Sequence, residues 1–260
     1  MGKGRVWMLA ALLSAGLAQA EMRVQTVEWT LDGQPYSGHV VYDDQGGPRP
    51  GLVMVPNWMG VTDAAVERAR ELAGSDYVVL VADMYGKDVR PADAKAASAQ
   101  VAALYADRDA LRARAAKAVE TLRGNAFGAP LDAERLGAVG FCFGGTTALE
   151  LARAGSDLAG VVSLHGGLTT SHPATATPTA AVLVLNGAAD RAVTAEDIAA
   201  FETEMDAVDA DWQFVNFADA VHCFAEPSAN SPPGCVYHER SAKRAYRYLH
   251  DFFAERFDRR

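Results

Sequence analysis

A cysteine lies between two glycines in the stretch Gly140-Phe141-Cys142-Phe143-Gly144, where an apolar segment gives way to a helical pattern. The spacing Gly-x-Cys-x-Gly is that of a nucleophile elbow, with a thiol where most such elbows carry a serine. A side chain at either glycine would collide with the neighbouring strand or helix. A helix that begins at Phe143 would also point its N-terminal dipole at the sulfur and favour the thiolate. The motif predicts a nucleophile, although a cysteine that only packs in a tight turn would have similar neighbours.

Two residues that could serve this thiol follow later apolar segments. Asp190 comes after residues 180–187, and His222 comes after residues 211–219. The carboxylate could orient the imidazole, which could then act as a general base. The chain order nucleophile, acid, histidine is that of α/β-hydrolases. Each residue alone could be an ordinary loop residue, but the three in this order predict a Cys-His-Asp triad.

Other uses of these side chains are less consistent with the spacing. Cys142, Asp190 and His222 could bind zinc, but the close pairing of ligands that is typical of zinc sites is absent. We therefore predict no metal ion. His165 also ends an apolar segment and could compete as the base. Because it precedes Asp190 and breaks the expected order, we expect it only to line the substrate pocket.

The segments between these residues have the pattern of a sheet covered by helices. Two stretches of alternating polarity around an Asp-Gly turn predict an antiparallel start. Apolar runs that are typical of fully buried strands then alternate with amphipathic segments. The predicted strands are 22–31, 36–44, 51–56, 77–83, 136–141, 158–166, 180–187 and 211–219, and the predicted helices are 63–73, 92–123 with a break near Asp107, 146–154, 195–208 and 238–257.

This order of elements predicts an α/β-hydrolase fold, with a mostly parallel, twisted sheet and helices on both faces. No linker divides the chain, so we expect a single domain over residues 21–260. In such sheets, catalytic groups collect just past the carboxyl ends of the strands. All three predicted triad residues follow predicted strands.

The first 20 residues have the three-part pattern of a secretory signal peptide. A basic start with Lys3 and Arg5 precedes an apolar run and the small-x-small sequence Ala18-Gln19-Ala20. The run is too short to span a bilayer comfortably. We expect cleavage after Ala20 and a periplasmic or secreted protein, monomeric and without a membrane anchor. Cleavage would change the formal charge from −9 to −11, which argues against a nucleic-acid partner.

The chain has three cysteines, so an oxidising compartment would leave one of them unpaired. Cys223 and Cys235 flank a loop rich in Pro, Ser and Asn, and we predict that they form a disulfide. A link across so short a loop stabilises by about 3 kcal/mol in the chain-entropy description. Cys142 would then remain free. Two unpaired, buried thiols at 223 and 235 are the alternative.

The sequences GFCFGG, NGAAD, HCFAEP and VADMYGKD together resemble those of the dienelactone hydrolase family, over nearly all of the chain after the leader. The resemblance implies that Cys142, His222 and Asp190 hydrolyse a small-molecule ester or lactone through a thioester, without a cofactor. It also implies that the backbone N–H groups of Phe143 and Trp58 form the oxyanion hole.

Several pocket positions depart from the family pattern. Asn57 stands where dienelactone enzymes carry a Glu that helps to activate the thiol. Lys87 and Glu226 stand where two Arg residues hold the substrate carboxylate. Because Glu226 reverses that charge, we expect an uncharged substrate. Tyr85 and Trp58 are candidate pocket walls, or else ordinary core aromatics.

Two functions from other classes remain open. A secreted thiol redox or peroxide-scavenging protein would use Cys142 and Cys223 as an exchangeable pair. A binding protein could use the same scaffold without catalysis. The disulfide pairing separates the hydrolase from the redox protein, because a Cys223–Cys235 link favours the hydrolase and a Cys142–Cys223 link favours the redox protein.

Overall fold

An eight-stranded sheet in the order β1-β2-β4-β3-β5-β6-β7-β8 forms the centre of the computed structural model. The model describes residues 21–258, so the predicted signal peptide lies outside the described residues. The strands are β1 (Met22–Leu31), β2 (Gln34–Asp43), β3 (Arg49–Val55), β4 (Val78–Val81), β5 (Leu131–Phe141), β6 (Gly160–Leu164), β7 (Ala181–Gly187) and β8 (Trp212–Phe217). The β1–β2 and β2–β4 pairs are antiparallel and all other neighbours are parallel. This confirms the predicted sheet and its antiparallel start.

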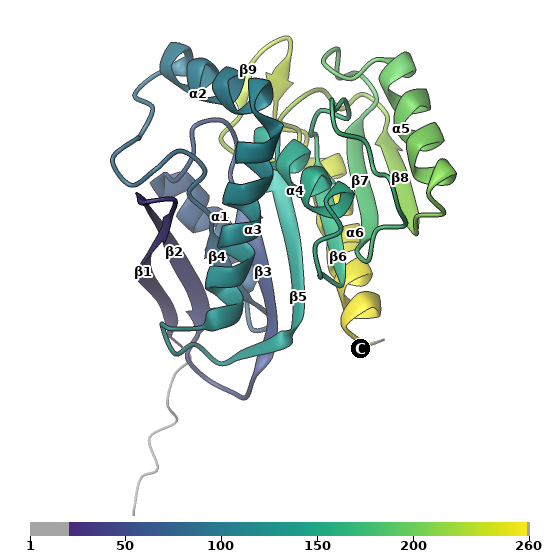
Figure 1. The fold of residues 1–260 in the computed structure, drawn as a ribbon. Helices are drawn as coiled ribbons and strands as arrows, with labels where there is room; N and C mark the ends of the chain where they lie inside the picture. The colour runs from purple at the N-terminus through teal and green to yellow at the C-terminus, as the bar shows by residue number, and fades with distance from the viewer. Residues whose placement is uncertain (1–20, 259–260) are drawn as a thin grey trace, which may run out of the picture.

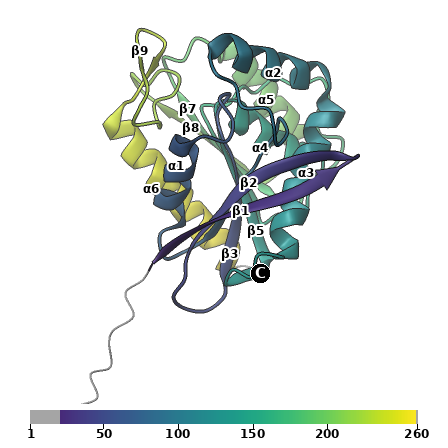
Figure 2. The ribbon, with the colours of Figure 1, turned by 90° about the vertical axis from the view of Figure 1, so that its left-hand side faces the viewer.

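Helices cover both faces of the sheet, as Figures 1 and 2 show. They are α1 (Asp63–Ala73), α2 (Ala94–Ala106), α3 (Arg108–Gly124), α4 (Phe143–Arg153), α5 (Ala195–Ala207) and α6 (Glu239–Asp258). Alternate residues of β3 divide the core between the faces. Leu52 and Met54 pack in the cluster that contains α1 and α6, and Val53 and Val55 pack in the cluster that contains α3, α4 and α5.

Strand β4 is shorter than the predicted strand 77–83. The N–H of Tyr77 donates to the carbonyl of Ala73 at the end of α1, at 3.0 Å. At the other end, the Asp83 carboxylate accepts the N–H groups of Tyr85 and Gly86 at 3.0 and 3.1 Å. Both ends of the apolar run are therefore turns, and the carboxyl-terminal turn leads the chain over the top of the sheet.

A small antiparallel hairpin of β9 (Asn230–Ser231) and β10 (Cys235–Val236) is absent from the predicted pattern. Because this segment is rich in Pro, Ser and Asn, its composition predicts a loop and gives no sign of the two short strands. The hairpin lies at the top of Figure 1, above the sheet. No helix in the described part of the chain is long and apolar enough to cross a membrane.

Candidate active site

Cys142 occupies the sharp turn between β5 and α4, with φ 55° and ψ −119°. A Cβ atom on Gly140 would lie 1.9 Å from the carbonyl oxygen of Gly144. One on Gly144 would lie 2.0 Å from the carbonyl oxygen of Val55 in β3. Only glycine fits at either position, because real side chains never approach backbone so closely. The turn places Cys142 just past the carboxyl end of β5, as the motif predicts.

Hydrogen bonds join Cys142, His222 and Asp190 in one chain. Nε2 of His222 lies 3.1 Å from Sγ of Cys142, and Nδ1 lies 2.7 Å from Oδ2 of Asp190. Asp190 is buried and its other oxygen accepts the N–H of Ala192 at 2.9 Å. Burial lowers the pKa of His222, but the bonds to Asp190 and Cys142 outweigh it and raise the pKa to about 10. The imidazole can therefore hold a proton beside the sulfur.

The backbone of His222 is fixed by the cross-linked hairpin. Cys223 and Cys235 form the predicted disulfide, and Cys142 is a free thiol. The N–H of Val236 donates to the carbonyl of His222 at 3.1 Å, and His222 forms an isolated bridge with Cys235. The hairpin thus acts as a local strand partner for the residue whose ring contacts the sulfur.

His165 lies behind the turn at Cys142 and does not line the cavity described below. Its Nδ1 accepts the N–H of Cys142 at 3.1 Å, and the same N–H also donates to the carbonyl of Leu164 at 3.0 Å. Burial, with the nearby charge of His222, lowers the pKa of His165 well below its usual value. The ring is therefore neutral, and its proton lies on Nε2, 3.9 Å from the Glu226 carboxylate. It supports the backbone of the nucleophile position and does not point at the sulfur.

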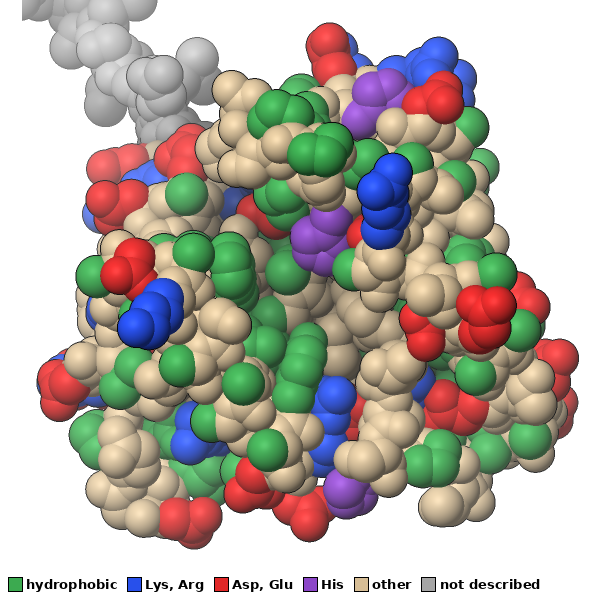
Figure 3. All heavy atoms as spheres, turned by 90° about the horizontal axis from the view of Figure 1, so that it is seen from above, with side chains coloured by type: hydrophobic (Ala, Val, Ile, Leu, Met, Phe, Trp, Pro, Cys, Tyr) green, Lys and Arg blue, Asp and Glu red, His purple; other side chains and the backbone are tan. Residues whose placement is uncertain are grey.

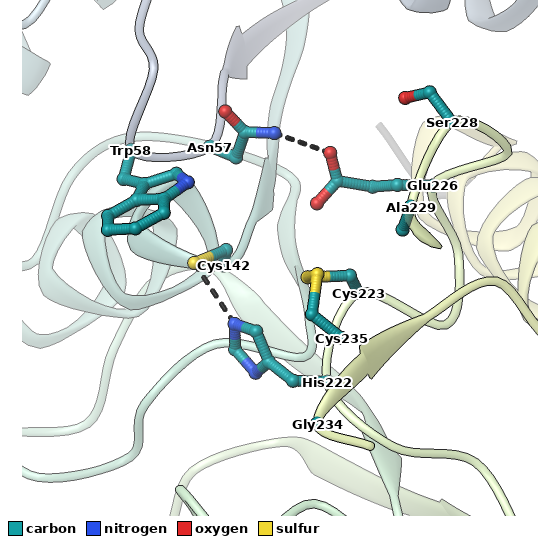
Figure 4. A pocket seen from close by; sticks show the side chains of 10 residues that line it. All are labelled: Asn57, Trp58, Cys142, His222, Cys223, Glu226, Ser228, Ala229, Gly234 and Cys235. Atoms are coloured by element: carbon teal, nitrogen blue, oxygen red, sulfur yellow. Dashed lines mark hydrogen bonds between the residues drawn. A yellow bond between two sulfur atoms is a disulfide. The ribbon is translucent and has the colours of Figure 1, made fainter. Parts of the chain in front are cut away.

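A cavity of about 410 Å³ opens above the thiol (Figure 4). Among the described residues that line it, Glu226 supplies the one carboxyl side chain, and no lysine or arginine is present. The lining residues are Asn57, Trp58, Cys142, His222, Cys223, Glu226, Ser228, Ala229, Gly234 and Cys235. Seen from above the sheet, the same face is hollowed around a histidine (Figure 3).

Asn57 and Glu226 form a bridge across this cavity. Nδ2 of Asn57 donates to Oε2 of Glu226 (Figure 4), and its Oδ1 accepts the N–H of Met59 at 3.0 Å. The hydroxyl of Tyr85 donates to the carbonyl of Trp58 at 2.8 Å. Burial raises the pKa of Glu226, and the bond from Asn57 opposes that rise. The loop that carries Trp58 is therefore braced from two sides.

The other residues that the resemblance assigns to the site do not all face the cavity. The N–H groups of Trp58 and Phe143 donate no hydrogen bond to any other described group, so both are free to bind an anionic oxygen. Tyr85 does not line the cavity but braces the Trp58 loop and packs against Phe143, with ring centroids 5.7 Å apart. Lys87 lies outside the cavity, because its Nζ is 2.7 Å from the carboxylate of Glu28 in β1.

The sequence gives no direct sign of the Asn57–Glu226 bridge, because the two residues are 169 positions apart. A signal was nevertheless present in the departures from the family pattern. The resemblance implies a Glu at position 57 and an Arg at position 226, whereas this chain has Asn57 and Glu226. Both partners of the bridge are therefore positions where the chain departs from that pattern.

The mostly parallel sheet, the sharp turn at Cys142 after β5 and the order Cys142, Asp190, His222 are those of an α/β-hydrolase. The model of the dienelactone hydrolase family matches residues 37–257. The chain therefore belongs to the dienelactone hydrolase family, as the resemblance indicates, and is a hydrolase of the ester- or lactone-cleaving class.

Solved structures and curated sequences agree with this family. The structure named m3DLH is 38% identical, with 91% of this chain and 99% of that chain covered and a TM-score of 0.85. The dienelactone hydrolase-like promiscuous phosphotriesterase P91 from metagenomic libraries is 35% identical, with the same coverage and a TM-score of 0.83. A Salmonella typhimurium protein, provisionally named a carboxymethylenebutenolidase, is 27% identical over 80% of this chain and 78% of its own length.

Proposed function

We propose that Cys142 is the nucleophile of a secreted enzyme that hydrolyses uncharged esters or lactones through a thioester. The observation that carries this proposal is the continuous chain of contacts from Asp190 through His222 to the sulfur, at 2.7 and 3.1 Å. A proton held on the imidazole leaves the sulfur as the attacking thiolate. Asp190 fixes the imidazole with Nδ1 toward the carboxylate.

In the first half-reaction the thiolate attacks the carbonyl carbon. The N–H groups of Phe143 and Trp58 bind the resulting oxyanion, an interaction on the order of 3–4 kcal/mol per donor. The carbon–oxygen bond to the alcohol then breaks, and His222 gives its proton to the departing alkoxide. In the second half-reaction His222 takes a proton from water, the hydroxide attacks the thioester, and the carboxylic acid leaves as the thiolate is restored.

The charge of the cavity supports an uncharged acyl group. Glu226 faces the same space as the thiol, while Lys87 is paired with Glu28 outside it. An anionic acyl group would therefore meet a carboxyl side chain and no lysine or arginine. Asn57 cannot take a proton, so thiol activation depends on His222 and on the N-terminal dipole of α4.

The disulfide pairing supports a hydrolase over a thiol redox protein. Cys223 is bonded to Cys235, so it is not paired with Cys142. It also supports export to an oxidising compartment. We accordingly propose that residues 1–20 are a cleaved leader and that residues 21–260 act as a monomeric, single-domain enzyme.

A second candidate substrate class is the neutral phosphotriester. The relative P91, 35% identical to this chain, is a promiscuous phosphotriesterase. A thiolate with two free N–H donors beside it could attack phosphorus as well as carbon. Diethyl p-nitrophenyl phosphate, assayed beside p-nitrophenyl acetate, distinguishes the two classes by p-nitrophenol release.

The proposal is tested by Cys142→Ala in the mature chain, with p-nitrophenyl acetate and a neutral lactone as substrates. We expect kcat to fall by at least about a thousandfold with little change in Tm. Mass spectrometry of the parent enzyme, quenched during turnover, should show an acetyl group on Cys142. An alanine variant as active as the parent, or an acyl group on another residue, would overturn the assignment.

A further inference from the structure

A second cavity adjoins the cavity above the thiol at His222 and Gly234, which line both. It has a volume of about 570 Å³ and is lined in part by Asp190, Arg191 and Pro233. His222 therefore borders two hollows, and only the first of them is lined by Cys142 and Trp58.

The two cavities carry opposite charges. Glu226 lies on the wall of the first. In the second, the Asp190 carboxylate is buried and already accepts hydrogen bonds from His222 and Ala192. Arg191 is exposed and has no ion-pair partner among the described residues, 21–258. The charge that the second cavity offers to a ligand is therefore positive.

The direction of the reaction assigns a role to each cavity, if the proposed function holds. Trp58, whose N–H is one of the two proposed oxyanion donors, lines the first cavity together with Cys142, so the acyl group stays there. His222 must deliver its proton to the leaving oxygen, which places the departing alcohol against the imidazole. The alcohol portion then extends past the ring toward Arg191.

We propose that the second cavity is a leaving-group subsite, and that Arg191 makes it selective for an alcohol that carries an anionic group such as a carboxylate. The guanidinium can bind such a group through two parallel hydrogen bonds. The preferred substrate is then an ester with a neutral acyl group and an anionic alcohol portion. This proposal rests on the proposed function and narrows its substrate class.

The test compares kcat/KM for 3-butyryloxybenzoate and for its methyl ester, which differ in the charge of the leaving phenol. Arg191→Gln should lower the ratio of the anionic to the neutral ester by about threefold to fivefold, and Arg191→Glu should lower it further. Arg191→Lys should retain part of the preference. Because the contact is exposed, added salt should shrink the effect in the parent enzyme.

Two controls show whether the preference arises at Arg191 or from the general charge of the surface. Arg244→Gln removes the same charge from α6, in a surface hollow away from the thiol, and should leave the ratio unchanged. Monophenyl succinate, whose charge is on the acyl side, should gain nothing from Arg191. An unchanged ratio in Arg191→Gln, or an equal fall in Arg244→Gln, overturns the subsite. Full activity in Cys142→Ala overturns the proposed function instead.

Discussion

The turn at Cys142 and the His222 loop, residues 222–236, hold the thiol and the imidazole of the candidate site by different means. At the turn, backbone atoms come so close that glycine is required at 140 and 144. The His222 loop is instead held by a disulfide, by the β9–β10 hairpin and by the bond from Asn57 to Glu226. One group is positioned by local sterics, and the other by contacts between distant parts of the chain.

Because of this difference, substitutions at the turn and in the His222 loop should have different effects. A side chain added at Gly140 or Gly144 would collide with backbone atoms that cannot move without shifting β3 or α4. A change in the His222 loop removes a brace and leaves the rest of the sheet intact. Damage at the turn should therefore affect folding, and damage in the loop should mainly affect the placement of the imidazole.

Gly144→Ala should have the largest effect. Its new Cβ would lie 2.0 Å from the carbonyl oxygen of Val55, so we expect a loss of about 3 kcal/mol or more in the free energy of unfolding. Gly124→Ala is the matched control, because nothing lies within 4 Å of a Cβ at that helical position. It should be neutral or stabilising by up to about 1 kcal/mol. Urea unfolding measures both, and equal effects would show that the clash with Val55 is not the cause.

Replacement of both Cys223 and Cys235 by alanine should have the next largest effect. Without the link, the unfolded chain gains entropy, and we expect a loss of about 3 kcal/mol. The N–H of Val236 would no longer be held against the carbonyl of His222, so kcat should fall as well. Thermal unfolding and ester hydrolysis, both without reductant, measure the two effects. A variant with parental kcat would show that the hairpin does not position His222.

Replacement of Glu226 should have the smallest effect. Two variants separate the contribution of its hydrogen-bond acceptor from that of its charge. Glu226→Ala removes the acceptor for Asn57 and should lose about 1–2 kcal/mol of stability. Glu226→Gln keeps an acceptor oxygen and removes only the charge, so its stability should stay closer to the parent. If the two variants are equally stable, the bridge to Asn57 contributes nothing measurable.

The stability of Glu226→Gln relative to the parent should also depend on pH. Burial raises the pKa of Glu226 above its ordinary 4.5, so the folded state holds this proton to a higher pH than the unfolded state does. The carboxyl therefore stabilises the fold fully below pH 4.5, and that contribution is lost as pH rises through the raised value. The stability of the glutamine variant relative to the parent should rise as pH increases above 4.5, as measured by urea unfolding.

The contrast between the two regions also accounts for what the sequence could predict. The apolar runs and the glycine spacing are local signals, and they place the eight strands of the sheet and the turn at Cys142 correctly, although the ends of β4 differ. The role of His165 was less accessible, because the bond from the N–H of Cys142 to its ring joins residues that follow two neighbouring strands, β5 and β6. The Asn57–Glu226 bridge and the Lys87–Glu28 pair depend on tertiary packing in the same way.

The disulfide of the β9–β10 hairpin makes the position of His222 depend on the redox state of the chain. Disulfides persist in oxidising compartments and are rare in a reducing cytosol. Under the proposed export, a newly made chain would therefore lack this brace on the imidazole until it left the cytosol. Oxidation of one short loop would then be the last step in assembling the proposed site.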